Sequence, residues 1–159
     1  MSGCSKKKSQ QHSNVASQEL KNNVNSLLSH IGGGQGLPDM CLDENNHCML
    51  LLDDKIILNL DFDDKKGTLV IYAYIGEVPL ANREAIYTQA LEDNFFWNGT
   101  GGATLGLDKQ SQSLMLVKTY TLPLQDFNSF EDELSNFVEI VDKWIVAIET
   151  ASDTSKEVG

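Results

Sequence analysis

The sequence has few cysteines, and their pattern does not suggest a disulfide framework. Cys4, Cys41 and Cys48 are odd in number and unevenly spaced along 159 residues, whereas disulfide-rich domains carry an even, regularly spaced set. A chain of this length can bury a sizeable core without disulfides or a structural metal. We therefore expect one ordinary globular domain in a reducing compartment.

Positive charge is also scarce. Twelve Lys and Arg residues stand against 23 Asp and Glu residues, which gives a formal net charge of −11. Such a chain is repelled by nucleic acid and by anionic membrane surfaces. A basic or amphipathic polypeptide remains a suitable partner.

No apolar run is long enough to span a bilayer. Residues 1–10 are polar and include three consecutive lysines, and residues 11–14 lack the apolar stretch of a secretory signal. We expect no membrane insertion and a cytoplasmic location.

One group of carboxylates superficially suggests a calcium loop. Asp61, Asp63 and Asp64 precede Gly67, but Lys65 stands where a ligand is needed and the glycine comes one place late. A solvated hairpin turn is the better interpretation.

Other candidate sites also fail on spacing. Residues 32–36 are glycine-rich but follow a helix and lack the lysine of a phosphate loop. Cys41, His47 and Cys48 give only three possible zinc ligands, at a spacing that no common zinc site uses. No histidine is obviously paired with a nucleophile and an acid. We expect no catalytic residues, no metal and no cofactor, and hence no enzyme.

Hydrophobic periodicity predicts an α+β domain. Short polar turns join consecutive strands, so the sheet is expected to be antiparallel and twisted, with helices packed against it. We expect a polar tail at 1–16, the domain at 17–149 and a second polar tail at 150–159. The predicted order is α-β-β-β-α-β-β-α, with helices at 17–31, 83–96 and 127–149 and strands at 48–53, 55–62, 68–75, 103–107 and 114–122.

The strands carry apolar residues on both faces. An antiparallel sheet with one wet face should alternate between apolar and polar residues, but Met49 and Leu51 oppose Cys48 and Leu50. Either helices or loops cover both faces, or one face binds a partner chain. The run Phe95-Phe96-Trp97 supports the second alternative, because a helix end cannot turn three consecutive aromatics into one core.

Several local patterns, taken in order, resemble the class I type III secretion chaperones of the Tir chaperone (CesT) family. The most specific part is Leu91-Glu92-Asp93-Asn94 followed by Gly101-Gly102-Ala103-Thr104-Leu105-Gly106-Leu107-Asp108. The other parts are Ile31-Gly32 before Gly36-Leu37-Pro38, then Leu58-Asn59-Leu60, the run from Tyr72 to Pro79, and Trp144 in the closing helix.

The resemblance implies a homodimer that binds the N-terminal chaperone-binding region of a secreted effector in extended form. It would keep the effector soluble and secretion-competent and present it to the secretion apparatus, whose ATPase is a further expected partner. The alternative is a structural or regulatory secretion-system module that forms a heterodimer with a related chaperone and has no effector of its own.

By the same resemblance, the first helix and first three strands form the effector groove, and the second helix with the last two strands forms the dimer interface. The expected effector-binding residues are Leu20, Val24, Met49, Leu51, Ile57, Val70 and Tyr72. The expected dimer-interface residues are Tyr87, Leu91, Phe95, Phe96, Trp97, Leu105 and Met115.

Overall fold

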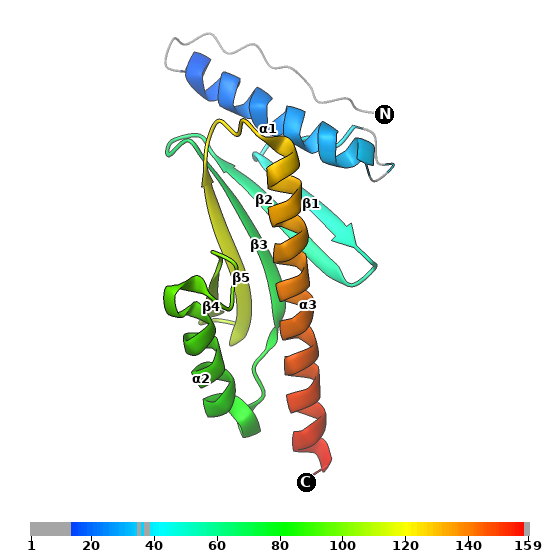
Figure 1. Cartoon of the computed structure of the whole chain (residues 1–159), viewed down its shortest axis with the longest axis vertical. Helices are drawn as coiled ribbons and strands as arrows, with labels where there is room; N and C mark the ends of the chain where they lie inside the picture. The colour runs from blue at the N-terminus through cyan, green and yellow to red at the C-terminus, as the bar shows by residue number, and fades with distance from the viewer. Residues whose placement is uncertain (1–13, 35, 37–38, 158–159) are drawn as a thin grey trace. The chain divides into compact units, whose positions relative to one another are not determined.

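The predicted α+β order is confirmed by a computed structural model that describes residues 14–34, 36 and 39–157 (Figure 1). None of the helices in this described part is both long and apolar enough to cross a membrane. The elements are α1 (Asn14–Gly34), β1 (His47–Leu52), β2 (Ile56–Asp63), β3 (Thr68–Glu77), η1 (Leu80–Asn82), α2 (Arg83–Asn94), η2 (Phe95–Trp97), β4 (Thr104–Asp108), β5 (Ser113–Thr121) and α3 (Phe127–Glu157).

The five strands form one sheet in the order β1-β2-β3-β5-β4, so β1 and β4 are its edges. The β4 strand pairs antiparallel with β5, and Leu105 lies opposite Leu116. The β1–β2 turn places Asp53 and Asp54 at φ 53° and 54°. Aspartate is one of the few residues besides glycine that enters this left-handed region at modest cost, which explains the paired aspartates.

The described chain divides into two compact units. The first unit contains the chain up to Leu50, with Asn59–Ile71 and Thr119–Glu131. In it the amide of Asn23 donates to the backbone oxygen of Leu124 and accepts from the Leu124 N–H. The buried side chains of this unit are Val24, Leu27, Leu28, Ile31, Leu42, Cys48, Leu50, Leu60, Phe62, Leu69, Ile71, Leu122 and Phe130.

The second unit contains Leu51–Leu58, Tyr72–Lys118 and the chain from Asp132 onward. Gly76 of β3 lies against α3, where a Cβ would come within 3.1 Å of Ile148. A larger residue there would push the helix from the strand. The largest buried side chain of the unit is Trp144, whose indole N–H donates to Asp93 of α2 at 3.2 Å.

Helix α1 runs through the glycines that were expected to end it. Gly32, Gly33 and Gly34 are helical, and the first left-handed glycine is Gly36, with φ 70°. A glycine in that conformation is a common helix stop. Residues 14–16 also belong to α1, so the predicted tail is wrong at those positions; residues 1–13 lie outside the described part, as do Leu37 and Pro38.

Helix α3 is longer than predicted, because it continues through Glu157 where a polar tail was expected from residue 150. The extension is anchored, since the side-chain amide of Asn82 donates to the backbone oxygen of Ala151 at 3.0 Å. Asn82 stands at the N-cap position of α2, but its side chain makes no capping bond.

Candidate partner-binding surfaces

Strands β1 and β2 expose apolar side chains at alternate positions. Met49 and Leu51 are 61% and 59% exposed, while Cys48 and Leu50 between and beside them are buried. Ile57 of β2 is 46% exposed between two buried neighbours. The side of these strands that carries Met49, Leu51 and Ile57, termed here the outward strand positions, is therefore apolar and open to solvent in the isolated chain.

The third strand continues the same alternation. Val70 and Tyr72 are half-buried, and Tyr74 is 51% exposed. Tyr74 was not among the expected binding residues, although the period of two that selects Tyr72 also selects it. The two expected residues of α1 differ from each other, because Leu20 is half-buried whereas Val24 is completely buried. We therefore correct the placement of Val24, which packs in the core of the first unit and offers no surface.

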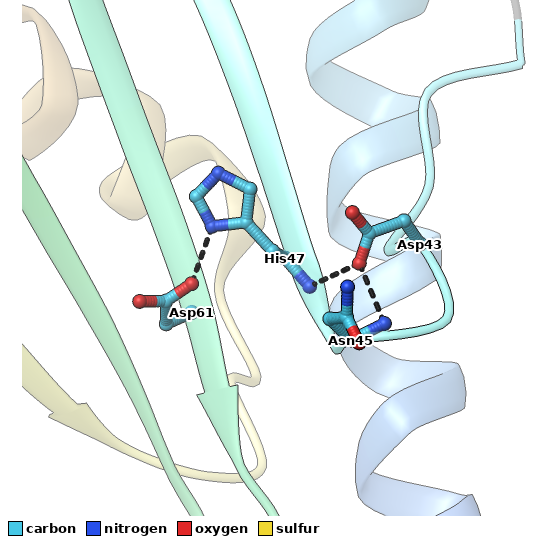
Figure 2. Close-up of polar contacts among 4 residues, drawn as sticks. All are labelled: Asp43, Asn45, His47 and Asp61. Carbon is cyan, nitrogen blue, oxygen red and sulfur yellow. Dashed lines mark hydrogen bonds and ion pairs between the residues drawn. The ribbon is translucent and has the colours of Figure 1, made fainter.

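A cluster of polar residues lies at the start of β1, before the outward strand positions (Figure 2). The His47 ring nitrogen Nδ1 contacts Asp61 Oδ1 across β1 and β2. The backbone N–H groups of Asn45 and His47 both donate to Asp43 Oδ1, at 2.8 and 2.9 Å. These donors, chiefly that of His47, hold the pKa of the Asp43 carboxyl below its usual value. The carboxylate thus fixes the loop that enters β1.

A second exposed apolar cluster lies at the end of α2. Phe95, Phe96 and Trp97 of η2, termed here the aromatic turn, are 67%, 72% and 54% exposed. Leu91 of α2 is 71% exposed and Leu107 of β4 is 44% exposed in the same unit. Leu107, like Leu80 before α2, was not among the expected residues.

The aromatic turn is strained and firmly held. Phe96 and Trp97 have φ 52° and 55°, a conformation that costs bulky residues roughly 1–3 kcal/mol each. The Trp97 indole N–H donates to Thr104 Oγ1 at 3.2 Å, and the Gly102 N–H donates to the Trp97 backbone oxygen. The strained backbone persists because these hydrogen bonds hold it in place. As a result, the aromatic side chains point into solvent.

The remaining expected interface residues divide by burial. Tyr87 and Met115 are half-buried. Leu105 is 5% exposed, so its expected place at the interface is wrong and it belongs to the core of the second unit. The short apolar–glycine–apolar pattern of β4 does not reveal which of its leucines points inward.

The described residues contain no group of three or more His, Cys, Asp or Glu side chains that could hold a metal ion. Burial raises the pKa of the Cys48 thiol, which lowers its reactivity. An open groove runs along α2 and the short helix η1 before it. Its lining residues are Ala81, Asn82, Glu84, Ala85, Thr88, Gln89, Glu92 and Asp93.

The element order agrees with a comparison to known families. The sequence profile of the Tir chaperone protein (CesT) family matches residues 26–145, which is most of the chain. The chain belongs to this family. The α+β fold with a five-stranded sheet is that of type III secretion chaperones.

Individual relatives support this assignment. The transcriptional anti-antiactivator ExsC of Pseudomonas aeruginosa is 25% identical over 79% of this chain and 86% of its own length. The ExsC–ExsE complex superposes with a TM-score of 0.68 over 81% of this chain and 96% of its counterpart. Two further structures are similar in fold alone. The HopA1–SchA chaperone–effector complex has a TM-score of 0.65 and 17% identity, over 79% of this chain and 94% of its counterpart. The ExoU–SpcU heterodimeric complex of the P. aeruginosa type III secretion system has a TM-score of 0.63 and 16% identity, over 80% of this chain and 98% of its counterpart.

Proposed function

We propose that the chain is a type III secretion chaperone that binds the N-terminal chaperone-binding region of a secreted effector in extended form. The observation that carries the proposal is the apolar surface at the outward strand positions, on a chain of the CesT family. Met49 and Leu51 are more than half exposed, and exposed apolar surface of this kind marks an interaction site.

An extended partner suits this surface better than a folded one. A strand exposes its side chains at every second residue, so a partner in extended conformation can set alternate apolar side chains against alternate positions of the sheet. The chain supplies Met49 and Leu51 on one strand and Ile57 on the next. Binding would keep the effector soluble and competent for secretion, and would allow its presentation to the secretion apparatus and its ATPase.

The aromatic turn has a different role in this proposal. It would pack against a second copy of the chain, with Leu91 and the half-buried Tyr87 and Met115 beside it in the dimer interface. Large aromatics are enriched at the cores of such interfaces. Their strained, pinned backbone supports a fixed surface of this type rather than an adaptable one.

Light scattering tests the proposal through stoichiometry. The chain alone should have the mass of a dimer, and addition of the N-terminal region of a candidate effector should give two chains with one effector segment. A strict monomer that forms no complex with any candidate effector would contradict the proposal.

A second candidate function is regulatory. ExsC, 25% identical to this chain, is named as a transcriptional anti-antiactivator, which favours a module that binds a regulatory protein of the secretion system. The same measurement separates the two candidates. A regulatory module would form its stable complex with a related chaperone or a regulator and would leave the effector segments unbound.

A further inference from the structure

The two edges of the sheet differ in what occupies their outer backbone groups. In an antiparallel strand, successive residues direct their N–H and C=O groups alternately toward the neighbouring strand and away from it. An edge strand therefore has a row of outer groups that can pair with an added strand. Edges β1 and β4 can be compared residue by residue.

On β4, the last side chain of α2 and one side chain of the α2–β4 connection occupy the outer groups. The side-chain amide of Asn94 donates to the Leu105 backbone oxygen at 2.9 Å, and the Leu105 N–H donates to Asn94 Oδ1 at 2.8 Å. An asparagine amide carries the same donor and acceptor as a peptide group, so Asn94 takes the place of a neighbouring strand at Leu105.

The outer backbone groups of Ala103, the residue before β4, are also occupied. The Ala103 N–H donates to the Thr100 backbone oxygen at 3.1 Å, and the Thr100 hydroxyl donates to the Ala103 backbone oxygen. Thr100 is 1% exposed, one of two buried polar residues in the described part of the chain. A buried hydroxyl must be hydrogen-bonded to avoid a penalty, and this one is bonded to the sheet edge.

On β1, within the part of the chain that the structure describes, only the outer groups of the first residue are occupied in this way. The His47 N–H donates to Asp43 Oδ1, and the Asp43 N–H donates to the His47 backbone oxygen at 2.8 Å. The backbone oxygen of Asn46 accepts from the Phe62 N–H of β2, so the backbone groups of Asn46 face β2. Because this direction alternates from one residue to the next, the backbone groups of Met49 and Leu51 face away from β2. Among the described residues, no hydrogen bond outside the strand ladder uses them.

We propose that Asn94 and Thr100 seal the β4 edge against added strands. The seal stands next to the exposed Leu107 and the aromatic turn, where an open edge would expose both apolar side chains and free backbone groups. Without the seal, β4 of one copy would pair with β4 of another. The seal does not rest on the proposed function.

Hydrogen exchange on the chain alone tests the seal at a single amide. The Leu105 N–H has Asn94 as its partner, so N94A should speed its exchange by about tenfold or more, as for a local opening. The Gly106 N–H points toward β5 and should keep its rate. Equal acceleration at both amides would mean general destabilisation and would overturn the proposal, as would no change at Leu105.

Light scattering over a range of concentrations tests the consequence. N94A should form species larger than the wild-type chain, and N98A, the same substitution at an exposed asparagine of the connection, should not. In the double variant N94A/L107K, a lysine on the edge strand should abolish the larger species without restoring the Asn94 bonds. A wild-type or smaller mass for N94A, or large species that persist with L107K, would overturn the seal. Neither experiment measures effector binding. Both therefore test the seal even if the chain binds no effector.

Discussion

Asp43 illustrates how one exposed carboxylate organises the start of a strand. Its Oδ1 accepts two backbone N–H groups, from Asn45 and His47, and its own N–H donates to His47. These bonds close the loop that leads into β1 and occupy the outer groups of the first residue in that strand (Figure 2). The open part of the edge consequently begins at Met49.

This arrangement predicts a pH-dependent contribution to stability. The pKa of Asp43 is lowered in the folded chain, chiefly by the bond from His47, so the ionised carboxylate favours folding. The contribution is present above the unfolded-state pKa and is lost as the pH falls through the folded-state pKa. Urea unfolding should show D43A less stable than wild type at pH 7, with the difference shrinking in strongly acidic buffer. A difference that is constant across this range would contradict the assignment.

Ile57 and Leu58 are adjacent apolar residues with opposite environments. Ile57 is 46% exposed and Leu58 is 0% exposed. The substitution I57D should change the free energy of unfolding by no more than about 1 kcal/mol, as for a surface position, whereas L58D buries a charge and should prevent stable folding. Denaturant titration checks both. Severe unfolding of I57D would mean that Ile57 contributes to the core.

At the scale of elements, helix α3 depends on a defined start. The Ser129 N–H donates to Asp126 Oδ1 at 3.0 Å, and the Phe130 N–H donates to the Asp126 backbone oxygen, so Asp126 is the N-cap. Removing such a cap typically costs about 1 kcal/mol. D126A should lower the unfolding free energy by that amount in urea titration, and Q125A, at the exposed preceding residue, should leave it unchanged. Equal stability of the two variants would contradict the cap.

The aromatic turn predicts a change in assembly. Trp97 is 54% exposed and Phe96 72% exposed in the isolated chain, so F96D should leave the fold intact while placing a charge in the proposed dimer interface. The mass by light scattering should fall from dimer to monomer at micromolar concentration. Val146 of α3, 48% exposed, provides the control variant V146D, which should remain dimeric. A dimeric F96D would place the interface elsewhere.

Elements with a clear period were predictable from sequence, whereas their ends and the direction of single residues in α1 and β4 were not. The alternation of β2 and β3 is explicit in the sequence, and their buried positions follow it. The end of α1 depends on which glycine adopts φ > 0, and the end of α3 on a distant contact from Asn82. Leu105 and Val24 were misplaced because an apolar residue in a short or two-sided pattern carries no mark of its direction. The bonds of Asn94 and Thr100 to the β4 edge are tertiary and leave no periodic signal.

At the scale of the whole molecule, the chain combines a strong acidic charge with exposed apolar surface. The net charge of −11 opposes non-specific association. Apolar side chains on β1 and β2 and at the aromatic turn remain exposed nonetheless. This combination suits a protein that binds other chains and remains soluble before it does so.

The central claim is that the outward strand positions hold an extended effector segment, and its most direct test is a titration by calorimetry. The N-terminal region of a candidate effector is titrated into the wild-type chain, I57D and V146D, which change residues of nearly equal exposure. The account predicts that I57D weakens binding by about tenfold or more, equivalent to about 1.4 kcal/mol, while V146D binds as wild type. Equal affinity of I57D and V146D would contradict it.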